Sequence, residues 1–253
     1  MFDAQDHSPR LSDLKRAALR AALCGMCGAV LLAGALDWAL DLPPAHSIAT
    51  LGLYLGCILV ARQWLPDHAP HQHLGIANLI TALRAGMVAN LGGFLLAPPG
   101  SATTAWCVIG LAIVALILDG VDGWAARRTG QASAFGARID QELDGLMMVI
   151  LAALIWRMEV AGAWILIAGA WRYAFLILRA FVPSLRGELA DSRRRRVLCG
   201  VAVGGLIACL GPIWSGPFAL VLAGAVVAAL STSFILDIRW LWTHRKSTKG
   251  EFT

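Results

Sequence analysis

Four aspartates between residues 119 and 144 have the spacing of residues on helix faces. Asp119 and Asp122 are three residues apart, and Asp140 and Asp144 are four residues apart. On α-helices, each pair would lie on one face, so two helices would each present two carboxylates. The stretch lies between two of the most apolar runs of the chain, where ionised carboxylates are costly and normally line a polar cavity. Four carboxylates together would repel one another unless a cation lies among them.

A divalent metal ion is the simplest cation for such a site. All-oxygen ligands favour Mg²⁺ or Mn²⁺ over zinc, and four aspartates could hold two ions for phosphoryl chemistry. Gly123, Ala126 and Gly136 leave room for a ligand against the backbone, and Arg127 could contact phosphate oxygens. The alternative is a set of salt bridges between helices in a loop. It accounts for each aspartate taken singly but not for their combined spacing.

Eight apolar runs predict the helices that position these residues. Hydrophobic residues make up 58% of the 253 residues and charged residues 15%, whereas soluble domains carry about 25% charged residues. A membrane crossing takes roughly 20 apolar residues. We therefore predict a single all-α, polytopic transmembrane bundle of about eight spans. The spans lie near residues 21–40, 45–61, 76–97, 103–119, 141–156 (or from Phe135), 160–182, 197–214 and 217–242.

Basic residues are distributed unequally between the two sets of connections. With both termini on the cytoplasmic side, the opposite connections contain only Arg157. This asymmetry fits the positive-inside rule, so we expect the aspartate stretch and both termini to face the cytoplasm, at the inner membrane of a bacterium. The net charge of +5 suits anionic membrane lipids, and nucleic-acid binding is not needed to explain it.

The aspartate stretch as a whole resembles the signature of the CDP-alcohol phosphotransferase family, DxxDGxxAR(x8)Gx3Dx3D. All its fixed positions are present, from Asp119 to Asp144. The resemblance implies an integral membrane enzyme that joins an alcohol to the phosphoryl group of a CDP-linked donor and releases CMP. It also implies a six-helix core. We expect an N-terminal segment, two additional helices, the family core and a cytoplasmic tail at residues 1–20, 21–65, 75–245 and 246–253.

The resemblance also assigns roles to the fixed positions. The expected metal ligands are Asp119, Asp122, Asp140 and Asp144. Asp144 is also the expected base that takes the proton of the acceptor hydroxyl. The CDP part of the donor is expected to lie against Gly123, Ala126, Arg127 and Gly136.

Further residues outside the signature are candidates for the same site. The stretch "NLITALR" resembles the NxxTxxR element of the family's first core helix, which adds Asn78 and Thr81 to the donor site and directs Arg84 to the same cavity. Helix-end capping and membrane anchoring are the alternatives. Arg172, in the middle of an apolar run, and Arg193, the first of four consecutive arginines, are expected at the acceptor site. Positive-inside anchoring explains most of the four arginines equally well.

The expected reaction is the transfer of a phosphatidyl group from CDP-diacylglycerol to a small polar alcohol, with two Mg²⁺ or Mn²⁺ ions, in phospholipid synthesis. Residues 140–145 are "DQELDG", unlike the "DPLADK" common in enzymes that make phosphatidylglycerol phosphate or the "DSLAD" frequent in phosphatidylserine synthases. The acceptor therefore stays open. A CDP-aminoalcohol donor with a lipid alcohol acceptor is the alternative within the enzyme class, and a cation transporter is the alternative outside it. The family resemblance also suggests a homodimer.

Overall fold

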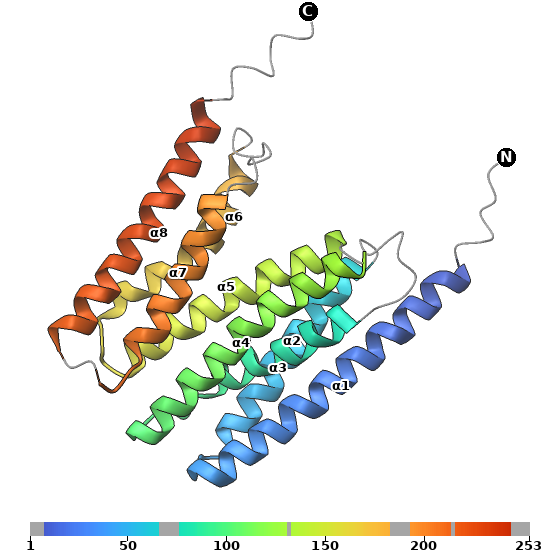
Figure 1. The fold of residues 1–253 in the computed structure, drawn as a ribbon, viewed down its shortest axis with the longest axis horizontal. Coiled ribbons are helices and arrows are strands. Elements are labelled where there is room, and N and C mark those ends of the chain that lie inside the picture. The colour runs from blue at the N-terminus through green and yellow to red at the C-terminus, as the bar shows by residue number, and fades with distance from the viewer. Residues whose placement is uncertain (1–7, 66–75, 131–132, 183–192, 214–215, 244–253) are drawn as a thin grey trace, which may run out of the picture. The chain divides into compact units, whose positions relative to one another are not determined.

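In the computed structural model, residues 8–65, 76–130, 133–182, 193–213 and 216–243 are described. All regular structure within these residues is helical (Figure 1), which confirms the all-α prediction. The elements are α1 (Ser8–Leu40), α2 (Ala45–Trp64), α3 (Ile76–Gly93), α4 (Ala102–Arg128), α5 (Ala134–Arg157), the 3-10 helix η2 (Ala163–Leu166), α6 (Ile167–Phe181), α7 (Arg193–Cys209) and α8 (Pro217–Thr243).

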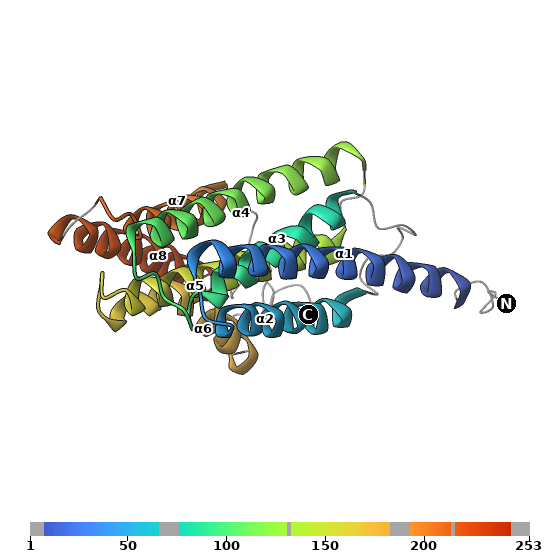
Figure 2. The same cartoon turned by 90° about the horizontal axis from the view of Figure 1, so that it is seen from below.

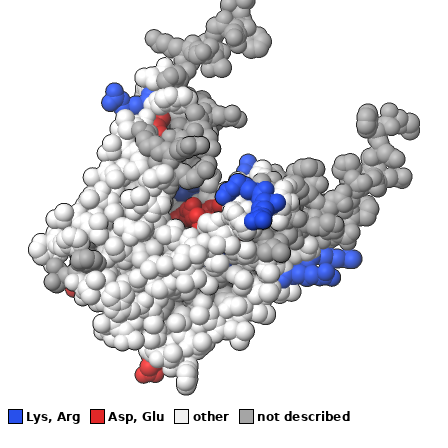
Figure 3. Space-filling view, in the orientation of Figure 1, with Lys and Arg blue, Asp and Glu red and all other residues white. Residues whose placement is uncertain are grey.

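Four of the described helices are long and apolar enough to cross a membrane, by length and composition. These candidate spans are Leu14–Leu40, Ala45–Trp64, Ala102–Arg128 and Pro217–Thr243. Large apolar side chains such as Leu31, Trp38 and Val221 are exposed on them, as expected for helices in contact with lipid. Uncharged residues also make up most of the face seen in Figure 3. The number of spans and the side of the termini stay predictions.

Two helices extend further into charged sequence than the apolar runs do. α1 begins at Ser8 with Pro9 in its first turn, where proline is tolerated, and no glycine or further proline follows before the apolar run begins near residue 21. α4 continues beyond Asp119 to Arg128, so the first half of the aspartate stretch is helical. Hydropathy predicted the start of the first helix near residue 21 and the end of the fourth near residue 119, at the edges of the apolar runs. The backbone is helical beyond both of these positions.

The connection between α4 and α5 is only five residues long, and it separates the two aspartate pairs. Gly130 has φ 67°, a left-handed conformation that glycine adopts without steric strain and that commonly follows a helix end. α5 then begins at Ala134, and the Gly136 N–H donates a hydrogen bond of 3.2 Å to the side-chain oxygen of Ser133. The chain reverses direction between α4 and α5 (Figure 1), which brings Asp140 of α5 close to Asp119 and Asp122 of α4.

The chain divides into two compact units, Met1–Met147 and Met148–Thr253, and α5 begins in the first and ends in the second. In the first unit, α3 packs against α1, α2 and α4 (Figure 2). A Cβ at Gly25 of α1 would lie 2.8 Å from the carbonyl oxygen of Ala82 on α3 and would collide with the Tyr54 hydroxyl. The absence of a side chain at Gly25 therefore allows α1 to pack closely against α2 and α3.

A buried polar cluster, which we call the histidine clamp, joins α3 to the same two helices. Nδ1 of His46 is 2.7 Å from Oδ1 of Asp37, and Nε2 is 3.2 Å from the carbonyl oxygen of Asn90. The Ser47 hydroxyl donates to Oδ2 of Asp37 at 2.5 Å. The Asn90 amide donates to the carbonyl oxygen of Ala29 at 3.2 Å. The clamp thus connects all three helices by hydrogen bonds.

In the second unit, α8 packs against α6, α7 and η2. Nε1 of Trp171 on α6 donates to the Ser231 hydroxyl on α8 at 2.7 Å, and the indole stacks on Phe234 with 5.7 Å between ring centroids. Gly205 of α7 has no side chain where Val226 of α8 approaches. Aromatic stacking and small residues therefore hold this unit together.

Candidate active site

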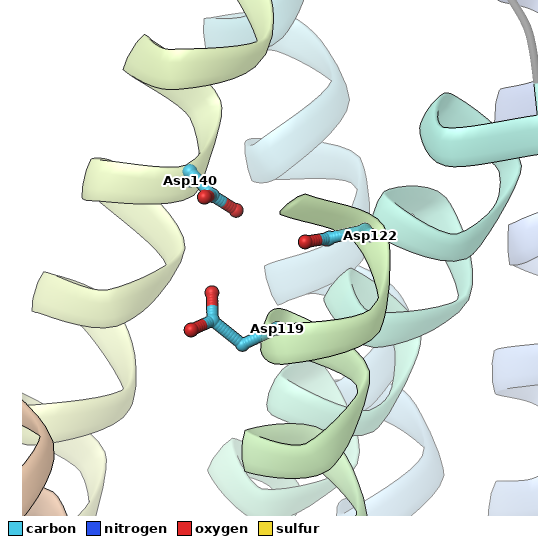
Figure 4. Close-up of side chains that lie close together, drawn as sticks. All are labelled: Asp119, Asp122 and Asp140. Atoms are coloured by element: carbon cyan, nitrogen blue, oxygen red, sulfur yellow. The ribbon is translucent and has the colours of Figure 1, made fainter. Parts of the chain in front are cut away.

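Three aspartates from two helices converge in the first unit. Figure 4 shows Asp119 and Asp122 on α4 and Asp140 on α5 with their carboxylates directed toward one another. One carboxylate oxygen of each residue lies within 4.8 Å of those of the other two. The three aspartates, which the sequence places on helix faces, thus lie close together in the structure.

The guanidinium group of Arg84 on α3 lies among the four aspartates of the signature. Its Nη1 is 2.6 Å from Oδ1 of Asp119, 3.6 Å from Oδ2 of Asp122 and 2.5 Å from Oδ1 of Asp140. Its Nη2 forms an ion pair with Oδ1 of Asp144. We call these five residues the carboxylate site. Four carboxylates and one guanidinium leave an excess of three negative charges when all are ionised.

The most buried aspartate of the site carries an unsatisfied acceptor. The side chain of Asp122 is 3% exposed, and its Oδ2 accepts a hydrogen bond of 3.1 Å from the Thr81 hydroxyl. Its Oδ1 is buried and accepts no hydrogen bond from the residues that the structure describes. A buried carboxylate oxygen without a partner is costly, and a coordinated cation would remove that cost.

These observations fit a hard divalent cation. Mg²⁺ binds carboxylate oxygens at about 2.0–2.1 Å, and Mn²⁺ takes similar oxygen ligands. The three converging carboxylates provide such ligands, and one of the three residues, Asp122, has a buried oxygen without a hydrogen-bond partner among the residues that the structure describes. The residues present are therefore suited to the metal ions predicted from the sequence.

The predicted donor-binding residues of the signature lie on the same two helices. Gly123 and Ala126 are half-buried near the end of α4. A Cβ at Gly123 would lie 3.3 Å from Nη1 of Arg127, so the arginine side chain folds back over this glycine. Gly136 lies in the first turn of α5, where Ser133 caps the helix. Their roles toward the donor stay predictions.

The element "NLITALR" forms part of α3. Thr81 and Arg84 both contact the aspartates, and Asn78 lies half-buried one turn before Thr81. The sequence directed Arg84 to this cavity but did not assign it a role. Its position three residues after Thr81 and its charge within an apolar helix were the available signals, since a buried charge is normally paired.

The two candidate acceptor residues lie in the second unit. Arg172 is half-buried on α6. Arg193 is the first residue of α7, but its side chain lies outside the described residues. The acceptor roles of both arginines stay predictions.

A sequence model of the CDP-alcohol phosphatidyltransferase family matches residues 74–237. The chain belongs to this family, which places it among membrane-associated transferases that use CDP-alcohols. The matched region includes the whole aspartate signature and Arg84. No curated protein and no solved structure matches the chain.

Proposed function

We propose that the protein transfers a phosphatidyl group from CDP-diacylglycerol to the hydroxyl of a small polar alcohol and releases CMP, as a step of phospholipid synthesis. The observation that carries this proposal is the convergence of Asp119, Asp122 and Asp140, with an orphaned buried oxygen on Asp122, in a chain of this family. A CDP-aminoalcohol acting on a lipid alcohol is the alternative within the family. Family membership favours both over a cation transporter.

The metal requirement follows from the charges that meet in the reaction. Asp119, Asp122 and Asp140 would hold one Mg²⁺ or Mn²⁺ ion, and Asp144 would take part in holding a second. When bound, these ions supply positive charge to the phosphate oxygens of the donor. Arg127, folded over Gly123, is placed to add a charge-assisted hydrogen bond to the same diphosphate.

Asp144 is the proposed general base. Its side chain is 43% exposed, the most of the four aspartates, so an alcohol can reach it, whereas Asp122 is 3% exposed. The alcohol oxygen attacks the phosphorus of the phosphatidyl group, and its proton passes to Asp144. The bond from this phosphorus to the bridging oxygen breaks, and CMP leaves with the electron pair. No covalent enzyme intermediate is required.

Small residues define the space for the nucleotide. Gly123, Ala126 and Gly136 would border the CDP part of the donor, with Asn78 and Thr81 on the facing helix α3. Arg172 and Arg193 would contact the acceptor. We also propose, from the distribution of basic residues, that the site faces the cytoplasm at a bacterial inner membrane. The homodimer suggested by the family resemblance is part of the same proposal.

The decisive experiment is a transfer assay with the purified protein. The protein is incubated with Mg²⁺ or Mn²⁺, CDP-diacylglycerol and a panel of polar alcohols, and CMP release is measured while mass spectrometry identifies the lipid formed. A parallel reaction contains CDP-aminoalcohols and diacylglycerol. Release of CMP in the second reaction alone would support the alternative, and no CMP from any CDP-linked donor would refute both.

A further inference from the structure

We propose that Arg84 is an internal counter-cation that occupies the metal-binding position of the carboxylate site and competes with the divalent ion for its oxygens. The inference rests on the proposed function, because it assigns a role within the same site. Arg84 is then a positioning residue that keeps the aspartates assembled before an ion binds and that sets the affinity for the ion.

The position of Arg84 coincides with the candidate metal position. The three oxygens that could share one ion come from Asp119, Asp122 and Asp140. Nη1 of Arg84 lies 2.6, 3.6 and 2.5 Å from oxygens of these same three residues. One nitrogen is thus at the point where the three carboxylates converge. A divalent ion at that point would displace it.

The charges of the site favour the same competition. Arg84 is completely buried, and the four aspartates around it would repel one another without it. Four carboxylates gather around this one guanidinium group, which favours the binding of a divalent ion. A guanidinium and a metal ion close together repel each other strongly, because a buried site screens charges weakly.

The guanidinium group of Arg84 also has incomplete hydrogen bonding. Its Nε is buried and donates no hydrogen bond to the residues that the structure describes. The observed position therefore leaves one guanidinium donor unsatisfied, which favours release of Nη1 when an ion takes over the carboxylates. Nη2 pairs with Asp144, outside the group of three oxygens. Arg84 can keep this ion pair and so continue to orient Asp144 after Nη1 has withdrawn.

The test is Mn²⁺ binding to the protein without substrates, measured from the electron paramagnetic resonance signal of free Mn²⁺. We expect Arg84→Gln to bind Mn²⁺ about tenfold more tightly than the wild type, and Arg84→Lys to lie between them, because a single ammonium group contacts fewer carboxylates. Arg128→Gln is the matched control, since it removes one positive charge from α4 where Arg128 lies over the Trp124 ring. Its affinity should stay close to that of the wild type.

If Arg84 only holds the aspartates in place, a folded Arg84→Gln should bind Mn²⁺ more weakly than the wild type. That result would overturn the inference, as would unchanged binding or the absence of Mn²⁺ binding in both proteins. If Arg84→Gln does not fold, Arg84→Lys is compared with the wild type instead. Tighter Mn²⁺ binding by Arg84→Lys then supports the inference, and weaker or unchanged binding overturns it. The proposed function fails separately, by the absence of CMP release, because the binding assay contains no CDP-linked donor.

Discussion

The carboxylate site and the histidine clamp are both buried polar clusters of the first unit, and both contain a residue of α3. Arg84 and Asn90 are six residues apart, which is about 9 Å along a helix. In the clamp, one carboxylate meets one imidazole whose two nitrogens both face oxygens, on Asp37 and Asn90. Oδ1 of Asp37 faces His46 and its Oδ2 accepts a hydrogen bond from the Ser47 hydroxyl, so both carboxylate oxygens have partners within the protein. In the carboxylate site, four carboxylates meet one arginine.

This difference separates a structural cluster from a functional one. Both oxygens of the clamp's carboxylate have partners within the protein, and the clamp connects α1, α2 and α3 without any ligand. The carboxylate site gathers four carboxylates around one guanidinium group and has an orphaned oxygen on Asp122, so it is suited to bind an external cation. Perturbing the first should therefore affect stability, and perturbing the second should affect chemistry.

Removal of metal should give the largest contrast. We expect chelation with EDTA to reduce CMP release to background and added Mg²⁺ or Mn²⁺ to restore it. Mn²⁺ at 100 times its Kd should also stabilise the folded protein by about 2.7 kcal/mol, seen as a higher melting temperature. His46→Ala should keep this thermal response and Asp122→Asn should lose it. An equal response in both variants would contradict the distinction between the two clusters.

Loss of the proposed base should have the next largest effect. Asp144→Asn is expected to reduce CMP release about 10³-fold, within the range for general base catalysis, while binding of CDP-diacylglycerol largely survives. Asp37→Asn in the clamp is the matched control, because it makes the same change of one atom. It should alter CMP release less than tenfold but lower the melting temperature. Wild-type turnover in Asp144→Asn would remove it as the base.

Breaking the clamp should lower stability and leave chemistry almost intact. His46→Ala removes the imidazole that contacts Oδ1 of Asp37 and the carbonyl oxygen of Asn90, and leaving these two acceptors without that partner should cost about 3 kcal/mol. Thermal unfolding in detergent should show this loss, while the Kd for Mn²⁺ stays near the wild-type value. A large change in Mn²⁺ affinity without a loss of stability would show that the two clusters are coupled.

A smaller change in the clamp tests how much each of its hydrogen bonds contributes to the free energy of unfolding. Ser47→Ala removes one hydrogen bond to Asp37 and keeps the contact between His46 and Asp37, so we expect a loss of about 1 kcal/mol. Its effect should therefore be clearly smaller than that of His46→Ala in the same unfolding experiment. Equal losses would mean that the imidazole contributes no more than the hydroxyl to the stability of the clamp.

The two clusters also differ in how well the sequence predicts them. The aspartates follow the regular spacing of helix faces, so their grouping could be inferred before the structure. The clamp joins Asp37 and His46, which flank a proline-containing connection, to Asn90 on a distant helix. No local periodicity links these residues. The contacts of Arg84 with all four aspartates likewise depend on how three helices pack, which spacing within one helix does not determine.

The close packing around Gly25 has a consequence for shortened forms of the protein. The family match begins at residue 74, but α1 and α2 precede it and bury the face of α3 that carries Ala85 and Ala89. A protein truncated to the matched region would expose this face of small residues, which larger lipid chains could not fill as closely as the Gly25 backbone does. The first two helices thus cover a face of α3, the helix that carries Arg84, which lipid would otherwise contact.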